Sequence, residues 1–439
     1  MRKKAKAPEK VPDKTGILFF PAFDWSLGET HPEREERLLY TQEQMFEEGV
    51  LDLPQVRQFA PAVCSLNAVA RAQAVLPEPG VHSLEAHLIA AGSALVLGEA
   101  WRRKEIANGF ALVRPPGHHA GAVVWGNRGF CTLNSEAIVA NDLRTRGVRR
   151  IAIVDTDVHH GDGTQDIFYH DPNVLFISLH QDGRTIYPGS GGVEEQGGPN
   201  AWGSCVNIPL LPGMGDEGFL YALENIVLPK IAAFEPDMII NAAGQDNHFT
   251  DPLAEMNVTA KGYGKITEVL RPDLAVLEGG YSIQGALPYV NMAIFLALCG
   301  ADYSGVREYY APSREEVKGA AVREYFRDLE EARKQVHHEW QRVTESFLPS
   351  PNWFYREVEF FYDTDDFMEK RREYIRPCRD CGGTVLMMTR NSMTLERGVI
   401  VRIPYGTCDA CRLAAERIYD CFIDEDSPMN RVVLVDNGQ

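Results

Sequence analysis

Short apolar runs recur along the chain up to Gly300, and stretches with helical spacing separate most of them. The runs cover residues 16–20, 110–113, 151–154, 174–179, 238–242 and 274–277. Residues 34–48 and 84–103 have the spacing of amphipathic helices, and Gly92 interrupts the second. Near-continuous apolar strands that alternate with helices are typical of a parallel sheet covered on both faces. The pattern therefore predicts a large α/β domain over residues 15–304.

The chain changes character after Gly300. Residues 305–370 are highly charged and mostly helix-forming, and the segment LPSPNW (348–353) breaks them. A small cysteine-containing unit is expected at 371–424. The ends are expected to be a basic tail at 1–14 and a C-terminal tail at 425–439.

The composition is that of an ordinary soluble globular protein. Of 439 residues, 44% are hydrophobic and 24% charged, and the net charge is −18. This charge disfavours broad nucleic-acid binding, although a local basic patch remains possible. No apolar run approaches the roughly 20 residues of a membrane span. The nine cysteines follow no signal peptide and do not indicate a disulfide framework, so we expect a cytoplasmic protein.

Polar side chains follow the carboxyl ends of five predicted strands. The segments are RPPGHHAG (114–121), DTDVHHGDG (155–163), HQDGRTIYPGSGG (180–192), AGQDNHFTDPL (243–253) and EGGYS (278–282). In open α/β sheets, ligands bind outside the carboxyl ends of the strands. Five such loops that converge on one edge of a sheet predict a functional site.

The second of these segments carries half of a metal site. Alternate side chains of an extended segment share a face, so Asp155, Asp157 and His159 point the same way. Asp157 and His159 supply two ligands, and Asp246 is the best candidate for the third ligand of a catalytic zinc. Fe(II) would also suit so oxygen-rich a site. Either ion lowers the pKa of bound water and makes it a usable nucleophile.

The tandem His118–His119 lies on another of these loops. It is either a further pair of ligands or, more sharply, a general acid–base pair beside the metal. Asp155 and Asp162 bracket the metal motif and are placed to fix the tautomers of the two imidazoles. Tyr281 would set a phenol hydroxyl against a developing oxyanion.

The motifs together resemble those of the zinc-dependent histone deacetylase family, in the form of its class II and bacterial branches. They are RPPGHHA (114–120), GFCTLN (129–134), IVDTDVHHGDGTQDIF (153–168), ISLH (177–180), YPGSG (187–191), AGQDNHFTDPL (243–253) and LEGGYS (277–282). The resemblance covers residues 16–300. It implies the arginase/deacetylase fold, with a parallel sheet of about eight strands, and metal-dependent cleavage of an acyl amide.

The same resemblance implies roles for single residues. Asp157, His159 and Asp246 match the family's zinc ligands, and His119 would take a proton from water while Tyr281 polarises the amide carbonyl. The expected substrate-binding residues are Gly129, Phe130, Tyr187 and Leu253. Potassium sites are implied at Ser178 and Leu179, and at Phe168, Asp171 and Val174.

Two departures from the family bear on the substrate. Leu253 stands where acetylpolyamine-specific members carry a gatekeeping Glu, which argues against a cationic polyamine, although Glu255 is close by. The loop AGAVVWGNR (120–128) is more apolar than usual. Val123, Val124 and Trp125 either pack inward as a plug or form a hydrophobic rim, and the plug is favoured because exposed Trp and Val together are unfavourable.

The C-terminal unit carries a second metal motif. Cys378-x2-Cys381 and Cys408-x2-Cys411 have the spacing of a structural zinc held by four thiolates. Residues 383–389 and 398–403, between the pairs, alternate like the strands of a hairpin, so the unit resembles a zinc ribbon. Its basic segment KRREYIRPCR (370–379) permits nucleic-acid contact, but a dimer contact or a lid over the active-site rim is at least as well supported.

These observations predict a metal-dependent amidohydrolase that removes acetyl or longer acyl groups from lysine side chains and forms homo-oligomers. Two alternatives stay open: a small-molecule deacetylase such as an acetylpolyamine amidohydrolase, and a non-catalytic metal-binding scaffold.

Overall fold

A computed structural model describes residues 13–23, 25–28, 30–75, 84–312, 314–347, 353–423 and 431–436; most of the expected basic tail at 1–14 lies outside them. The centre of the fold is an eight-stranded sheet in which every pair of neighbours is parallel. In spatial order its strands are β2 (Val56–Phe59), β1 (Thr15–Phe20), β4 (Asn108–Val113), β10 (Leu274–Leu277), β9 (Met238–Ala243), β6 (Ile151–Asp155), β7 (Val174–Gln181) and β8 (Cys205–Leu210). The predicted parallel α/β architecture is confirmed.

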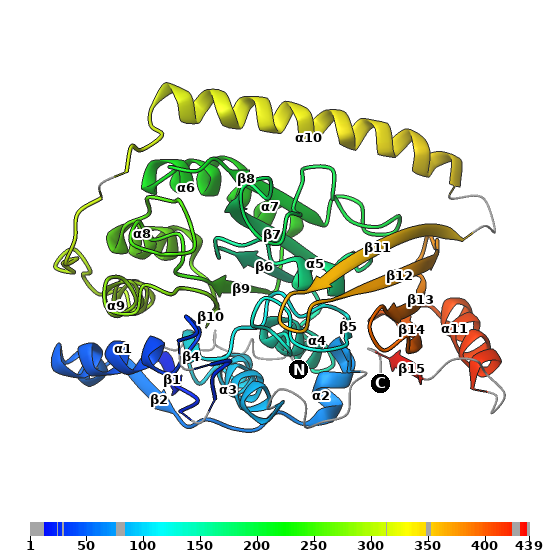
Figure 1. The fold of residues 1–439 in the computed structure, drawn as a ribbon, viewed down its shortest axis with the longest axis horizontal. Coiled ribbons are helices and arrows are strands. Elements are labelled where there is room, and N and C mark those ends of the chain that lie inside the picture. The colour runs from blue at the N-terminus through cyan, green and yellow to red at the C-terminus, as the bar shows by residue number, and fades with distance from the viewer. Residues whose placement is uncertain are drawn as a thin grey trace, which may run out of the picture.

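Helices cover both faces of this sheet (Figure 1). One face packs against α2 (Leu66–Ala72), α3 (Leu84–Arg102) and α4 (Ser135–Arg144). The other packs against α1 (Glu36–Glu47), α6 (Asp216–Ala222), α7 (Leu228–Phe234), α8 (Ala260–Leu270) and α9 (Leu287–Leu298). The short elements are α5 (Asp162–Phe168), the 3-10 turn at Val50–Asp52, the π-helical turn at Leu223–Val227, and the pair β3 (Ala74–Val75) and β5 (Val123–Val124). The two helices predicted from spacing are α1 and α3, and α3 runs unbroken through Gly92.

The remaining chain forms one long helix and a second sheet. Helix α10 (Ala320–Phe347) runs along one side of the α/β domain (Figure 1). The second sheet, called here the C-terminal sheet, consists of β11 (Phe354–Tyr362), β12 (Phe367–Arg376), β13 (Thr384–Asn391), β14 (Arg397–Ile403) and β15 (Arg431–Asp436). Its pairs are antiparallel except β14–β15, and α11 (Asp409–Phe422) follows β14.

This sheet is larger than the sequence predicted. Residues 354–370, expected to belong to a charged helical extension, form β11 and the start of β12, and part of the expected tail at 425–439 forms β15. The reason is visible in β12, whose buried positions include Glu369, Arg371 and Glu373. Buried and exposed positions alternate along β12, as in any half-buried strand, but charged side chains occupy the buried positions. The sequence therefore lacks the alternation of apolar and polar residues by which a strand is predicted.

The C-terminal sheet lies between the α/β domain and α11. Tyr362, Phe367 and Met387 join the same core cluster as α3 and α4. On the other face Val399 and Val401 pack with Ala415 of α11. The β11–β12 turn is thereby carried to the edge of the central sheet where the polar loops lie (Figure 1). Within the described part of the chain, no helix combines the length and the apolarity that crossing a membrane requires.

Candidate active site

Three expected metal ligands meet at the carboxyl ends of two neighbouring strands. Asp157 and His159 follow β6, and Asp246 follows β9, which pairs with β6. Their ligand atoms all lie within 4.8 Å of one another, and all three residues are buried. The Nδ1 atom of His159 is 3.1 Å from Asp157 Oδ1 and 3.1 Å from Asp246 Oδ2. The structure thus brings together the triad expected from residues distant in sequence.

The surroundings of the triad fit a divalent cation. Gly279 donates its backbone N–H to Asp157 Oδ2 at 2.7 Å. A Cβ atom at Gly279 would lie 2.2 Å from Asp246 Oδ2, so only glycine leaves the space beside both carboxylates open. Two carboxylates buried this close together are unfavourable without a positive charge between them. Two carboxylates and one imidazole are also a suitable ligand set for a catalytic zinc with an open position.

The paired histidines lie beside this triad, each against its own carboxylate. His118 Nδ1 is 3.1 Å from Asp155 Oδ2, and His119 Nδ1 is 2.8 Å from Asp162 Oδ1. The two imidazole rings are 4.1 Å apart between centroids, and the ring of His119 is 5.9 Å from that of His159. In both histidines Nδ1 is engaged, which leaves Nε2 as the nitrogen for chemistry. The Nε2 atom of His118 lies 3.7 Å from Oδ1 of Asp157, so the pair borders the metal triad directly.

The two imidazoles carry opposite protonation preferences. Burial opposes a charge on His118, but Asp157 and Asp155 together outweigh it and raise its pKa to about 10. Burial and then the neighbouring His118 lower the pKa of His119 to about 3, against the effect of Asp162. With no cation in the triad, these opposite shifts favour a proton on His118 and a neutral imidazole at His119. A divalent cation in the triad would lessen the influence of Asp157 on His118.

Tyr281 is fixed in place through its backbone N–H and through contacts of Arg37. Its N–H donates to Asp251 Oδ2 at 2.7 Å, and the guanidinium of Arg37 lies 5.0 Å from its ring centroid. Arg37 also donates to the carbonyl oxygens of Gly280 (2.7 Å) and Glu278 (2.5 Å), which fixes the turn before Tyr281. Burial raises the pKa of Tyr281 well above its usual value. Its hydroxyl therefore stays protonated and available as a hydrogen-bond donor.

Two aromatic rings lie beside residues of the site. The Phe130 ring is 5.6 Å from that of Tyr281, and the Tyr187 ring is 5.1 Å from that of His119. Gly129 precedes Phe130, and a Cβ atom there would lie 2.3 Å from His119 Cδ2. Leu253 is 39% exposed and is linked to Tyr281 only indirectly, since its N–H donates to the same Asp251 carboxylate.

The apolar segment after the histidine pair packs inward. Val123, Val124 and Trp125 are all buried, and Trp125 Nε1 donates to Thr389 Oγ1 of the C-terminal sheet at 3.0 Å. The prediction that this segment packs inward as a plug, and does not form a hydrophobic rim, is therefore confirmed. The side chains that cover it come from the C-terminal sheet, including Tyr362, whose hydroxyl accepts the N–H of Trp125 at 3.2 Å.

The residues expected at potassium sites lie deeper in the fold. Ser178 and Leu179 are buried in β7, where Ser178 pairs with Asp155 of β6. Phe168, Asp171 and Val174 follow one another from the end of α5 to the start of β7, with the N–H of Asp171 donating to the Phe168 carbonyl. The carboxylate of Asp171 is engaged by Arg144 at 2.6 Å.

The four ribbon cysteines form a second cluster. The sulfur atoms of Cys378, Cys381, Cys408 and Cys411 lie within 4.8 Å of one another. Cys378 and Cys408 are 3.9 Å apart between sulfurs, and the N–H of Gly383 points at Cys381 Sγ at 3.3 Å. Four sulfurs at this spacing suit a tetrahedral metal, as the sequence predicted.

Sequence reasoning missed several residues that shape the site. Arg128 contacts both the carboxylate of Asp162 and the carbonyl of His119, and it is buried. Arg37 and Asp251 both form hydrogen bonds with the backbone of the turn at Tyr281. The only sequence signal for Asp251 is its place before Pro252 in a polar loop. Arg37 carries no sequence signal, because a charged residue in an amphipathic helix is ordinarily assigned to the exposed face.

Comparison with known proteins agrees with this geometry. The Histone deacetylase domain family matches residues 77–296. A probable deacetylase of Archaeoglobus fulgidus is 42% identical over 325 residues, which are 67% of this chain and 89% of that protein. Histone deacetylase 15 of Arabidopsis thaliana is 42% identical over 210 residues, which are 46% of this chain but 38% of that protein.

A bacterial protein and a solved structure are also similar to this chain. A histone deacetylase-like amidohydrolase of Pseudomonas aeruginosa is 36% identical over 264 residues, 58% of this chain and 67% of that protein. The crystal structure of the HDA15 HD domain is similar in fold, with a TM-score of 0.64 and 28% identity over 77% of this chain and 99% of that one. The chain belongs to the histone deacetylase family and is a hydrolase that acts on amide bonds.

Proposed function

We propose that this protein is a metal-dependent deacylase that removes acetyl or longer acyl groups from lysine side chains. The observation that carries the proposal is the convergence of the metal triad, the paired His118 and His119 with their carboxylates, and the protonated hydroxyl of Tyr281. Hydrolysis of an amide needs an activated water, a group that accepts and returns a proton, and a donor to the carbonyl oxygen.

The residues divide this chemistry as follows. A zinc or iron(II) ion held by Asp157, His159 and Asp246 would supply Lewis acidity to the amide carbonyl and lower the pKa of water. His119, neutral and oriented by Asp162, accepts the proton of the attacking water on Nε2. It then returns that proton to the nitrogen of the leaving amine. The hydroxyl of Tyr281 donates to the carbonyl oxygen as negative charge builds there.

The walls of the site support an alkyl chain as the bound part of the substrate. The ring of Phe130 lies beside Tyr281 and that of Tyr187 beside His119, and Leu253 adds a partly exposed apolar side chain. A lysine side chain carrying an acyl group presents four neutral methylenes to such walls. The two relatives named as a probable deacetylase and a histone deacetylase-like amidohydrolase are consistent with this choice.

The test is turnover on a panel of amides by metal-loaded protein. We expect hydrolysis of acetyl-lysine or longer acyl-lysine peptides. Tyr281→Phe should lower kcat by about 10²–10³-fold, the effect of removing one oxyanion donor. Tyr289→Phe on α9 is the matched control, since it removes a hydroxyl outside the site and should leave kcat unchanged. No turnover on any acyl-lysine peptide would defeat the proposal.

A small acylated polyamine is the second candidate substrate. The observation that favours it is the β11–β12 turn, whose Asp363 carboxylate reaches Gly129 and Tyr187. N-acetylated polyamines in the same panel separate the two candidates. Leu253→Glu should shift the preference toward the polyamine, because a second carboxylate would then face a cationic amine.

We also propose zinc at the four cysteines and potassium at the two sites around Ser178 and Asp171. Four thiolates favour zinc, and the small ribbon around them has few apolar residues of its own. Metal analysis of the purified protein should then find tightly bound zinc that Cys408→Ser removes. Activity that does not depend on potassium concentration would contradict the second assignment.

A further inference from the structure

The C-terminal sheet reaches the walls of the active site through the turn between β11 and β12. Asp363, the first residue of that turn, accepts the backbone N–H of Gly129 at 2.8 Å through Oδ1. The same oxygen lies 3.3 Å from the hydroxyl of Tyr187, which donates to it. One carboxylate therefore joins the two segments that carry the flanking aromatics, and it comes from outside the part of the chain that the family match covers.

Both segments need a fixed position. Gly129 and Phe130 have φ angles of +53° and +68°, a left-handed conformation that is uncommon for phenylalanine. The strain must be balanced by contacts that hold the segment, and the Gly129 N–H is one such contact. On the other side, Tyr187 sets its ring against His119. A shift of either segment would change the width available to a substrate.

The turn itself is anchored on both sides of Asp363. The rings of Tyr362 and Phe367 stack at 4.5 Å, and Thr364 Oγ1 donates to Asn127 Oδ1 at 2.8 Å. Behind the turn, Arg371 forms a fully buried ion pair with Asp166 of α5. These contacts fix the position of the β11–β12 hairpin and therefore that of Asp363.

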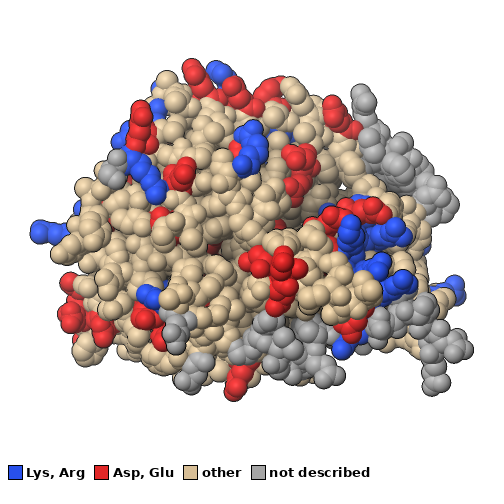
Figure 2. Space-filling model, in the orientation of Figure 1, with Lys and Arg blue, Asp and Glu red and all other residues tan. Residues whose placement is uncertain are grey.

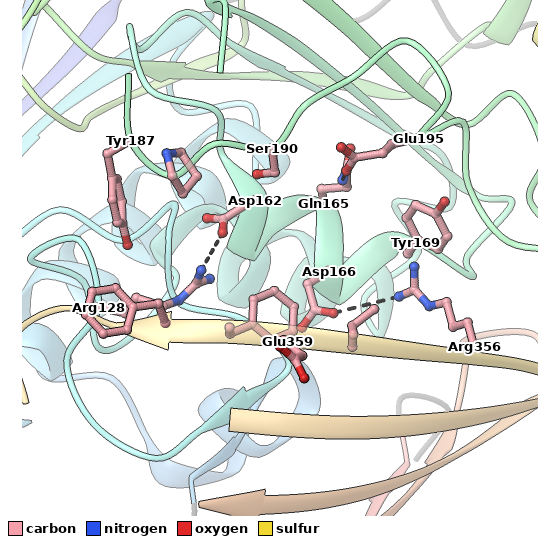
Figure 3. A pocket seen from close by; sticks show the side chains of 14 residues that line it. Arg128, Asp162, Gln165, Asp166, Tyr169, Tyr187, Ser190, Glu195, Arg356 and Glu359 are labelled. Carbon is pink, nitrogen blue, oxygen red and sulfur yellow. Dashed lines mark hydrogen bonds and ion pairs between the residues drawn. The ribbon is translucent and has the colours of Figure 1, made fainter. Parts of the chain in front are cut away.

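A pocket beside Tyr187 is lined by residues of both the α/β domain and the C-terminal sheet. Figure 3 shows β11 running past Arg128, Asp162 and Tyr187. The pocket between them has a volume of about 280 Å³, and Arg356 of β11 lies across it from Tyr187. The C-terminal sheet thus borders the carboxylate that orients His119, as well as the outer wall of the site.

We propose that Asp363 is a positioning residue that fixes the substrate channel by holding Gly129–Phe130 and Tyr187 at a set separation. The effect on catalysis that we infer for Asp363 rests on the proposed deacylase function. The C-terminal sheet is then a structural part of the deacylase site, and its role in the reaction is to set substrate affinity and not the rate of the chemical step.

A competing explanation is that the turn acts through charge alone. Asp363 and Asp365 are half-buried and Asp366 is exposed, and Figure 2 shows acidic side chains gathered near the hollow in the middle of this face. If attraction of a cationic substrate were the whole effect, any aspartate of the turn would serve. Asp366 provides the matched control, since Asn tolerates its φ of +53° and Asp366→Asn removes one charge at the same turn.

The experiment compares Asp363→Ala, Asp363→Asn and Asp366→Asn in the full chain. Steady-state kinetics on the best acyl-lysine peptide should show KM raised about tenfold in Asp363→Ala with kcat within about twofold, since a hydrogen bond to a charged acceptor is lost. Asp363→Asn keeps an oxygen for the Gly129 N–H, so KM should return to within about threefold of the wild type. Asp366→Asn should leave KM unchanged.

Deuterium exchange decides the inference independently of turnover. Peptides that cover Gly129 and Phe130 should exchange faster in Asp363→Ala and as slowly as wild type in Asp366→Asn. Wild-type protein that hydrolyses no amide would defeat the proposed function, and the exchange result would still test the positioning role. Unchanged exchange in Asp363→Ala, or an equal rise in KM in Asp363→Asn and Asp366→Asn, would overturn the inference.

Discussion

Glu136 and Glu278 are two carboxyl groups buried together behind the His118–His119 loop. Neither is exposed to solvent, and Glu278 Oε2 accepts the backbone N–H groups of Gly117 (2.7 Å) and His118 (3.0 Å). A charge on Glu136 disfavours a second charge on Glu278. Burial raises the pKa of Glu136 to about 7 and that of Glu278 well above its usual value. The pair therefore retains a proton at pH values where exposed glutamates have lost theirs.

This has a calculable effect on stability. Folding raises the pKa of Glu136 from 4.5 to about 7, so the folded state binds the proton more tightly than the unfolded state does. Stability is then highest below pH 4.5, falls as the pH rises through 7, and reaches a plateau above it. A shift of this size at 1.36 kcal/mol per pKa unit amounts to about 3 kcal/mol of destabilisation at pH 8.

Replacing Glu136 with glutamine tests this reasoning. Glutamine has nearly the same shape as glutamate and cannot ionise. We expect Glu136→Gln to match the wild type at pH 4.5 and to be more stable by about 3 kcal/mol at pH 8. For 439 residues at about 2.1 cal/mol/K each, that corresponds to a rise in Tm of about 3 °C.

The assay is calorimetry or urea unfolding of both proteins between pH 4.5 and 8, read as the difference between them. Glu47→Gln, the same change on the exposed face of α1, is the control and should show no such trend with pH. A Glu136→Gln protein whose advantage is the same at every pH, or that is less stable than wild type at pH 8, would refute the reasoning.

Three further changes have definite expected outcomes. Arg37→Met leaves the carbonyl of Gly280 buried without its donor, so the free energy of unfolding should fall by about 1–3 kcal/mol. We expect kcat to fall as well. An unchanged kcat would contradict the role given to Arg37. Cys381→Ser should reduce bound zinc by one ion and lower Tm, measured by metal analysis and calorimetry, while the other site keeps its metal. Trp125→Ala should cost about 3–5 kcal/mol of unfolding free energy through the cavity and the lost bond to Thr389, and a near-neutral result would show that the plug is not packed.

The central strands could be predicted because burial on both faces makes them continuous apolar runs. Asp157, His159 and Asp246 could be brought together from sequence for a related reason, since carboxyl ends of parallel strands meet at one edge. The edge strands β2 and β8 carry no such signal, because edge positions tolerate residues such as Gln58, Asn207 and Pro209.

Contacts made by single long side chains were beyond prediction. Arg37 reaches a carbonyl 243 residues away, and Asp363 reaches an N–H 234 residues away. Neither contact repeats along the chain, so no periodicity reports it. The residue types were also misleading, since a charged side chain in a helix or a turn is ordinarily a solvated one.

The plug under the C-terminal sheet has a consequence for the order in which the site acquires its shape. Trp125 donates its backbone N–H to a tyrosine hydroxyl made 237 residues later. A nascent chain thus already holds the metal ligands and both histidines while the segment from Val123 to Phe130 still lacks its cover. The residues of the metal triad and the histidine pair are synthesised first, but the segment after the pair is covered only when β11 to β13 have docked.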